Sequence, residues 1–438
     1  MHQNRRGAGR GHPRPSRPWV AIPLLTLLVA ACGSTTPSGS PSIGASSSAP
    51  STAPSAQATP VVDPSTVYAS IEDQVVGIRG LKPTATVQPK VLDDAGIKKL
   101  VADSFDKDNP KAVVDANERL MKAFDLLPED ASLSKLYIDL LGSQVAGLYN
   151  PDDKSLYVVS RSGGLGPAEK TTFAHEFTHA LQDQNFDLAT LKLDEIGSGD
   201  RSLGRLALVE GDAVLSQSAW QAQYLTQAEL LQLLAQSAND PSSAQLLSMP
   251  AILRDSLLFP YTSGLTFTST LQGTGGWAAI DDAYKTPPAS TEQILHPEKY
   301  AAHEAPLEVT LPKDLATRLG AGWTVALEDT FGEFQFGVWL RGNTAVGAAV
   351  ANDAATGWGG DRVAVLDGPN GAWGVVLRSV WDTAADAAQF EAAATPLVDG
   401  LRSPAALLPG AGGPERWVVI GSNDATLNAL AGALGLAG

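Results

Sequence analysis

Two histidines placed four residues apart, with a glutamate directly after the first, constrain this chain more than any other feature of its sequence. They are His175, Glu176 and His179 in the stretch FAHEFTHALQDQ. Residues four apart lie on one face of an α-helix, and a Gly-Pro turn just before the stretch is typical of a helix start. Both imidazoles can therefore reach one metal ion at about 2.0–2.1 Å. The pattern predicts a helix, starting near Ala168, that presents a metal site.

The glutamate next to the first histidine adds a chemical role to the predicted site. Glu176 is one position beyond His175, so its carboxylate points to the side of the ion, where it can meet a bound water. Zinc lowers the pKa of such a water towards about 7. A carboxylate beside that water can take its proton and pass it to a leaving amine. With only six histidines in the chain, chance is a poor explanation of this spacing.

Two histidines leave a third ligand to be found. Beyond the pair, the chain after its N-terminal segment offers only His296 and His303. A stronger candidate is Glu210 in LALVEGDAV, because a charge is expensive to bury in a largely apolar helical segment. Glu210 follows His179 by enough residues for the chain to turn and return antiparallel. The alternatives are a solvated carboxylate at this position, or Asp212, which falls on another face of the same helix.

These motifs resemble those of a known enzyme class. The pairing AHEFTHALQDQ…VEGDA is similar to the gluzincin branch of the HExxH metallopeptidases, as found in exported bacterial proteins, over roughly residues 140–300. The resemblance implies a mostly helical zincin-like catalytic domain that binds Zn²⁺ and hydrolyses peptide bonds. It gives His175, His179 and Glu210 to the zinc, and it gives Glu176 the activation of water.

A second branch of the same class is disfavoured. The metzincin pattern needs a third histidine six residues after His179, and Asn185 stands there instead. Asp183 lies four residues after His179 on the same helix face. It either orients a ligand histidine by accepting its second N–H or lies solvated at the helix end.

The resemblance also implies a place for substrate and for the developing oxyanion. In such enzymes an edge strand near the metal binds extended substrate as an added strand, and the hairpin QVAGLYN-PDDK-SLYVVS, which contains Tyr149, is the candidate for that strand. The alternative is a plain hairpin. A hydrogen-bond donor opposite Glu176 is needed for the oxyanion. His296 is the first candidate and Tyr261 and Tyr149 are lesser ones, although His296 can equally cap a short helix.

The first 31 residues read as a secretory signal. They carry five arginines and no acidic residue, followed by the apolar run WVAIPLLTLLVAAC, which is short for a membrane span. The ending Val-Ala-Ala-Cys resembles a bacterial lipobox. That resemblance implies cleavage before Cys32, a lipid on its sulfur and an extracytoplasmic protein anchored to the bacterial cell membrane. The alternatives are an ordinary signal peptide or an uncleaved anchor. Cys32 is the only cysteine, so no intramolecular disulfide can form.

Composition separates the chain into parts and excludes one class of partner. Residues 33–60 are rich in Ser, Pro and Ala, lack charge and aromatic side chains, and cannot bury enough surface to fold. The formal net charge of −16 argues against a nucleic-acid partner, which needs clustered Lys and Arg.

The hydrophobic periodicity predicts an α+β fold. Amphipathic helices with one short strand fill residues 65–143, the hairpin follows, and helices continue beyond the motif helix. PAILRDSLLFPYTSGLTFTSTLQ reads as a helix buried in a core, and the stretch from Gly273 to Tyr300 as loops with short helices. From Leu307 the pattern is α/β, with a hairpin through Pro-Asn-Gly, the buried strand ERWVVIGS and a final helix.

The predicted organisation has four parts. They are a lipoprotein signal peptide at 1–31, a disordered Ser/Pro/Ala-rich tether at 32–62, a mostly helical zincin-like metallopeptidase domain with a small β-sheet at 63–305, and a smaller C-terminal α/β domain at 306–438.

The sequence therefore predicts a membrane-anchored zinc metallopeptidase acting on a peptide or protein substrate. Two other functions stay open. One is a non-catalytic surface binding or assembly lipoprotein that retains a zincin fold, and the other is an amidase acting on cell-wall peptides. The pattern does not indicate an oligomeric state.

Overall fold

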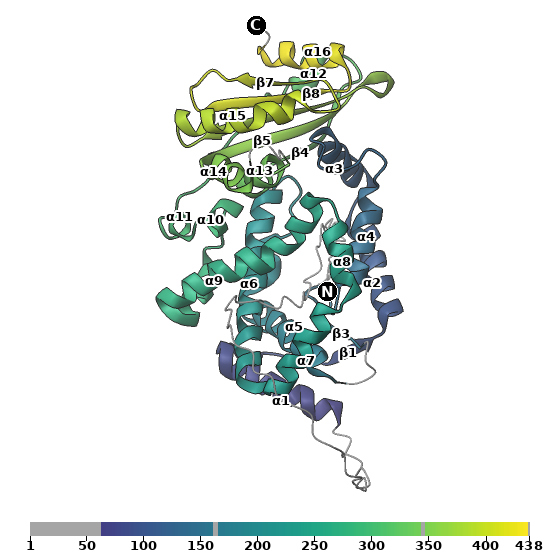
Figure 1. Cartoon of the computed structure of the whole chain (residues 1–438), viewed down its shortest axis with the longest axis vertical. Helices are drawn as coiled ribbons and strands as arrows, with labels where there is room; N and C mark the ends of the chain where they lie inside the picture. The colour runs from purple at the N-terminus through teal and green to yellow at the C-terminus, as the bar shows by residue number, and fades with distance from the viewer. Residues whose placement is uncertain (1–62, 161–164, 343–346, 437–438) are drawn as a thin grey trace, which may run out of the picture.

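The computed structural model describes residues 63–160, 165–342 and 347–436. Within them the chain forms a mostly helical region with a small mixed sheet, followed by a region built on a five-stranded antiparallel sheet with helices. Figure 1 shows the two regions stacked along the long axis, with the larger sheet at the C-terminal end. The expected α+β fold class is confirmed. The predicted signal peptide, Cys32 and the tether lie outside the described residues.

In the helical region, helices pack around the small sheet. Several of them begin at a polar residue that caps the first turn. Asp63, Asp93 and Ser132 each accept a backbone N–H of the first turn of the helix that follows, which satisfies a donor that the helix cannot. The helices are α1 Pro64–Arg79, α2 Asp94–Asp108, α3 Lys111–Ala123, α4 Leu133–Gln144, α5 Pro167–Phe186, α6 Gly199–Tyr224, α7 Gln227–Ala238, α8 Pro241–Ser248, α9 Ala251–Lys285, α10 Thr291–Leu295 and α11 Pro297–Ala301, with a 3₁₀ turn η1 at Leu188–Leu191.

The small sheet has the order β1-β3-β2, so β2 lies at an edge. Its strands are β1 Pro89–Leu92, β2 Gly147–Asn150 and β3 Ser155–Val159. The strands β2 and β3 pair antiparallel, as the predicted hairpin requires, and β1 joins β3 in parallel. One face of this sheet packs on α5. The one short strand predicted within residues 65–143 is β1, which has four residues and starts at a proline.

The helices α5, α6 and α9 form the centre of the helical region (Figure 1). Helix α5 begins with Pro167 after Gly166, as the Gly-Pro turn predicted, and ends at Asp187 in the left-handed conformation. Helices α6 and α9 cross at two glycines. A Cβ on Gly211 would lie 2.2 Å from the carbonyl oxygen of Gly264, and a Cβ on Gly264 would lie 2.2 Å from that of Ala207. This crossing requires glycine at both positions.

One predicted loop is in fact helical. Helix α9 continues through Trp277 to Lys285, where the sequence suggested loops, and it changes direction at Gly275 and Gly276. The glycines produce a kink, and the apolar residues beyond it, such as Ile280 and Ala283, are fully buried and restore the helix. Among the described helices, none combines the length and the apolar character that a membrane crossing needs.

The sheet region has the strand order β4-β5-β6-β8-β7, antiparallel throughout. The predicted hairpin is β5-β6, and its turn holds Asn370 at a positive φ. The sequence missed α12, α14 and the edge strand β7. The elements are α12 Leu315–Leu319, β4 Thr324–Asp329, α13 Gly332–Leu340, α14 Ala348–Thr356, β5 Trp358–Asp367, β6 Trp373–Trp381, α15 Ala384–Asp399, β7 Ala405–Pro409, β8 Glu415–Gly421 and α16 Asp424–Leu434.

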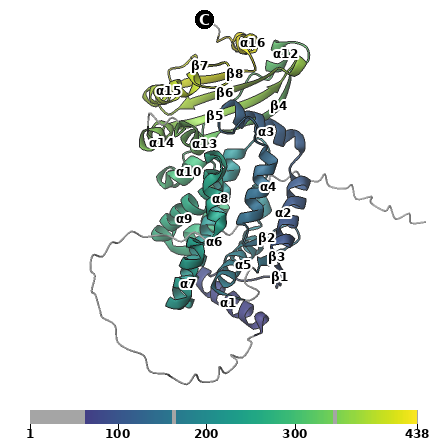
Figure 2. The same ribbon diagram turned by 45° about the vertical axis from the view of Figure 1, so that its right-hand side comes forward.

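Helices cover both faces of the larger sheet (Figure 2). On one face α13, α14 and α15 bury an aromatic core that includes Phe336, Trp339, Trp381 and Phe390. On the other face α12 and α16 close a smaller core around Leu430. Helix α3 of the helical region also packs against β4 and β5, so the two regions share a boundary.

Candidate metal centre

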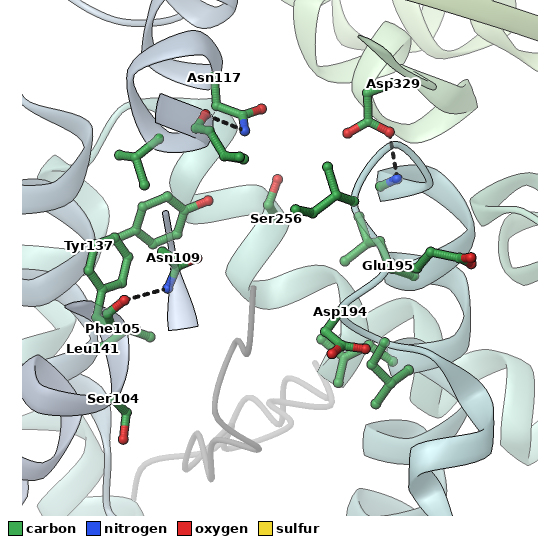
Figure 3. Close-up of a pocket in the computed structure, with 18 of the residues that line it drawn as sticks. Ser104, Phe105, Asn109, Asn117, Tyr137, Leu141, Asp194, Glu195, Ser256 and Asp329 are labelled. Carbon is green, nitrogen blue, oxygen red and sulfur yellow. Dashed lines mark hydrogen bonds between the residues drawn. The ribbon is translucent and has the colours of Figure 1, made fainter. Parts of the chain in front are cut away.

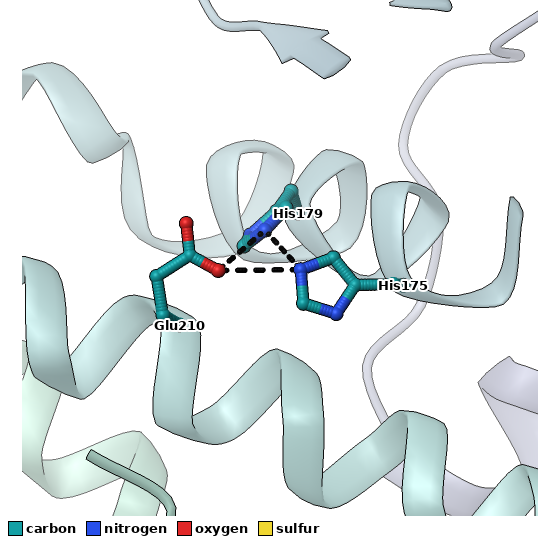
Figure 4. A group of neighbouring side chains, drawn as sticks. All are labelled: His175, His179 and Glu210. Atoms are coloured by element: carbon teal, nitrogen blue, oxygen red, sulfur yellow. Dashed lines mark hydrogen bonds and ion pairs between the residues drawn. The ribbon is translucent and has the colours of Figure 1, made fainter. Parts of the chain in front are cut away.

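Three side chains from two helices converge on one point. His175 and His179 come from α5 and Glu210 from α6, and each side chain is at most 1% exposed. The two Nε2 atoms lie 3.0 Å apart. The Oε2 atom of Glu210 lies 3.2 Å from Nε2 of His175 and 3.4 Å from Nε2 of His179. Figure 4 shows the resulting triangle, with all three groups pointing inward. We call these residues the triad.

The size and chemistry of the triad fit a metal ion. A tetrahedral ion bonded at about 2.0–2.1 Å keeps its ligand atoms about 3.3–3.4 Å apart. The three separations of 3.0, 3.2 and 3.4 Å are close to that value. Two imidazole nitrogens and one carboxylate oxygen form a donor set that leaves a tetrahedral ion one open position. The triad could therefore hold a metal ion.

The electrostatics of the triad point the same way. Burial opposes a charge on His179, but the carboxylate of Glu210 outweighs it and raises the pKa of His179 to about 9. Burial lowers the pKa of His175. Burial also works against the charge of Glu210, yet the neighbouring His179 holds the pKa of that carboxyl below its usual value. The buried carboxylate thus needs a positive charge beside it, and a metal cation supplies one in place of a proton.

Two glutamines set the orientation of the histidine rings. Nδ1 of His175 donates to Oε1 of Gln217 at 3.0 Å, and Nδ1 of His179 donates to Oε1 of Gln182 at 2.8 Å. The amide nitrogen of Gln182 in turn donates to the backbone carbonyl of Val209 at 3.0 Å. This bond orients the amide so that its oxygen faces His179. Each ring therefore keeps its Nε2 atom for the ion, as the second layer around a metal typically arranges.

Behind Gln182 lies a buried ion pair that sequence reasoning missed. Asp212 accepts hydrogen bonds from Gln182 at 3.0 Å, from Nε of Arg79 at 2.7 Å and from the hydroxyl of Tyr284 at 3.0 Å. The side chains of Arg79 and Asp212 are fully buried. Asp212, the rival ligand in the sequence, thus supports the triad from behind. Arg79 is the last residue of α1, and nothing in its local sequence indicated Asp212 as its partner.

The predicted base lies against the edge strand of the small sheet. Glu176 is fully buried on α5. A Cβ on Gly147 of β2 would meet Cγ of Glu176 at 2.8 Å and Cγ2 of Thr172 at 2.5 Å. Only glycine lets the strand come this close. The pairing of Glu176 with β2 therefore depends on the absence of a side chain at position 147.

Tyr149 and Asp183, two further sequence candidates, bind each other. The hydroxyl of Tyr149 donates to Asp183 at 2.7 Å, and Nζ of Lys154 lies 2.6 Å from the same oxygen. Asp183 is 5% exposed, so it is not solvated, and its hydrogen bonds tie the hairpin to α5. A role for Tyr149 in substrate binding stays a prediction. Because its hydroxyl already binds Asp183, this role would rest on the backbone of β2.

His296 and Tyr261, two of the candidates for the oxyanion donor, lie in different parts of the structure. His296 lies between α10 and α11, where its Nε2 atom is 2.9 Å from Oε1 of Glu333, and both line a cavity of about 430 Å³. The hydrogen bond from His296 to Glu333 raises the pKa of that histidine. Tyr261 instead lies beside the triad, with its ring nearly parallel to that of His175 at 6.3 Å between centroids. The role of His296 stays a prediction, and Tyr261 is the candidate that the fold brings to the metal centre.

A second acidic group in the described residues resembles a metal site but already holds a cation. Glu292, Glu304 and Asp382 converge, and Nζ of Lys299 lies 2.6, 3.0 and 2.9 Å from them, respectively. Burial raises the pKa of Glu292 to about 7. The ammonium group of Lys299 occupies the position that an ion would take.

Comparison with known proteins gives one match, and it lies in the sheet region. Residues 321–427 match the model of a family described as a domain of unknown function, DUF8575. No curated protein and no solved structure matches the chain. The triad precedes the matched residues, so its chemistry rests on its own geometry.

Proposed function

We propose that this protein is a zinc metallopeptidase that hydrolyses peptide bonds. The observation that carries the proposal is the buried triad with Glu176 directly beside it on α5. A structural metal site needs four protein ligands, and the triad brings together three among the described residues. A carboxylate next to a site with an open position is the arrangement that hydrolysis requires.

Each residue of the centre has a role in this proposal. His175, His179 and Glu210 hold the zinc, which would act as a Lewis acid and lower the pKa of a coordinated water. Glu176 accepts a proton from water and returns it to the leaving nitrogen. Tyr261, whose ring lies beside that of His175, would be the donor that stabilises the oxyanion.

The edge strand β2 supports a peptide as the substrate. Within the described residues, one side of β2 pairs with β3 and its other side carries no strand. An extended peptide can add there as a further strand through backbone hydrogen bonds. Because Gly147 of β2 lies against Glu176, a peptide on this edge would bring a scissile bond close to the base.

The proposal includes the predicted location and organisation. A lipid on Cys32 would anchor the protein to the outer face of the bacterial cell membrane, and the residues up to 62 would hold the enzyme away from it. Residues 63–305 would form the catalytic domain and residues 306–438 a second domain.

The test compares Glu176→Gln with Glu210→Ala and the wild type. Each protein is incubated with a diverse peptide library, cleavage is measured by mass spectrometry, and bound metal by elemental analysis. We expect one zinc and cleavage in the wild type, one zinc without cleavage in Glu176→Gln, and loss of both in Glu210→Ala. Equal cleavage by the wild type and Glu176→Gln would refute the proposal.

A further inference from the structure

A cavity of about 300 Å³ lies in the helical region, at the end where it meets the sheet region. Figure 3 shows its two walls, with Phe105, Tyr137 and Leu141 from α2 and α4 on one side, and Asp194 and Glu195 after η1 on the other. The sheet region closes one end through β4 and α13. The volume is at the lower end of the range of small-ligand sites, about 300–1,000 Å³.

Two elements connect this cavity to the metal centre. Leu206 lines the cavity and lies one helical turn before Glu210 on the same face of α6. Leu148 of β2 also lines it and is adjacent to Gly147, which touches Glu176. The side chains of a peptide added along β2 could therefore enter the cavity.

The lining of the cavity is mainly apolar. The helices α2, α3, α4 and α6 contribute apolar side chains such as Phe105, Met121, Tyr137, Leu203 and Leu206. An apolar side chain is stabilised when it leaves water for such a surface. The cavity therefore favours apolar side chains on its occupant.

The charges of the lining all have one sign. They are Asp152, Asp194, Glu195 and Asp329, with no Lys, Arg or His among the described residues that line the cavity. Glu195 forms an ion pair with Arg201, and Asp329 accepts backbone N–H groups. Asp152 and Asp194 have no cationic partner among the described residues. The cavity thus repels anionic groups and attracts cationic ones.

We propose that this cavity binds the side chains of a peptide substrate that combines apolar residues with Lys or Arg. The proposal rests on the proposed function and names the substrate class of the same site. It also gives the sheet region a part in recognition, because Leu327, Asp329 and Gln335 complete the lining.

The test measures peptide binding without turnover. Full-length Glu176→Gln protein, purified in detergent and loaded with zinc, is titrated with two dansyl-labelled decapeptides, one repeating Leu-Ala-Lys and the other Leu-Ala-Glu. Binding is followed by fluorescence anisotropy. We expect the lysine peptide to bind about tenfold more tightly than the glutamate peptide, since Asp152 and Asp194 line the cavity without a cationic partner among the described residues.

Two variants in this background locate the binding. Ser256 of α9 lines the cavity, so Ser256→Trp fills it and should weaken the lysine peptide about tenfold or more. Its matched control is Ser269→Trp on an exposed part of the same helix. Asp194→Lys should abolish the preference for the lysine peptide, whereas Asp73→Lys, at an exposed position on α1, should leave it unchanged.

The outcomes separate the cavity from the peptidase. An unchanged preference in Asp194→Lys, or no binding of the lysine peptide, overturns the cavity proposal, even if the wild type cleaves peptides. Binding that Asp194→Lys alters, without any cleavage by the wild type, supports the cavity and refutes the peptidase. If Ser256→Trp does not fold by circular dichroism, Asp194→Lys decides alone.

Discussion

The helical region and the sheet region bury different kinds of side chain. The helical region buries ionisable groups around α5 and α6, among them His175, Glu176, His179, Glu210 and Asp212. The cores of the sheet region consist of apolar side chains, with a cluster of aromatic rings on one face of the sheet and mostly aliphatic side chains on the other. Burial of a polar group costs free energy unless a partner compensates it. The helical region therefore buries charged groups that need partners, and a metal ion held by the triad would be one such partner.

A buried carboxylate of the sheet region sharpens this contrast. Asp361 is 4% exposed and accepts hydrogen bonds from the backbone N–H groups of Phe331 and Gly332 at 2.7 and 2.8 Å and from the indole of Trp358 at 2.8 Å. These three donors satisfy it without any ion. Glu210 instead faces two imidazole nitrogens of the triad, which could bind a metal ion together with it. A buried carboxylate is thus satisfied by neutral donors in one region and lies among possible metal ligands in the other.

The largest predicted difference between the regions concerns two helical glycines. Gly211→Ala places a Cβ 2.2 Å from the carbonyl oxygen of Gly264, so α6 and α9 must separate next to Glu210. We expect a loss of about 3 kcal/mol or more in the free energy of unfolding and weaker metal binding. Chemical denaturation and zinc titration measure the two effects.

The matched control lies in the sheet region. A Cβ on Gly432 of α16 meets nothing within 4 Å, so Gly432→Ala should be neutral or stabilising by up to about 1 kcal/mol. Equal effects of the two substitutions would contradict the tight crossing of α6 and α9.

The sequence predicted elements whose signals are local. The motif helix, the β2-β3 hairpin and the β5-β6 hairpin each show the right period beside a recognisable turn. Strand β7 was missed because its short run, Ala405–Pro409, ends in a proline and shows no alternation. The continuation of α9 past Gly276 was missed because burial against other helices, rather than local propensity, decides it.

The candidate site was predictable in part for the same reason. His175 and His179 are placed together by helix geometry alone, and Glu210 was found because a charge in an apolar segment needs an explanation. Gln217 and Arg79 carry no such signal, since each acts on a residue distant in the sequence. The partner of His296, Glu333, likewise comes from the sheet region, and no local pattern connects them.

The second prediction concerns pH. Burial raises the pKa of Asp361 to about 6 from its ordinary value of 3.8. The folded state therefore holds this proton more tightly than the unfolded state, and the stability that the proton contributes is lost as pH rises from about 4 to about 6. The shift corresponds to at most about 3 kcal/mol. Metal binding by the helical region has the opposite dependence, because protons compete with the ion for the histidines.

Asp361→Asn isolates this effect, since an amide does not titrate in this range. The free energy of unfolding of the sheet region, followed by tryptophan fluorescence, should fall between pH 4.5 and pH 7 by more in the wild type than in Asp361→Asn. A constant difference between the two proteins across these pH values would show that Asp361 ionises normally.

The smallest predicted effect tests whether polar partners in the helical region serve the metal. Gln217 accepts the Nδ1 proton of His175 at 3.0 Å and touches no proposed ligand atom of the ion. Gln217→Ala should therefore weaken zinc binding by about 10–100-fold, as the loss of a second-layer partner does, and should lower the free energy of unfolding by about 1–3 kcal/mol because the Nδ1 proton is left without an acceptor. Gln223→Ala, an exposed position on the same helix, should leave zinc affinity unchanged in a chelator competition. Gln217→Glu should retain zinc affinity, because a carboxylate accepts the same proton.

If Gln217→Ala loses stability but keeps its zinc affinity, then the buried polar groups of α6 serve the fold, as Asp361 does, and the contrast between the two regions fails.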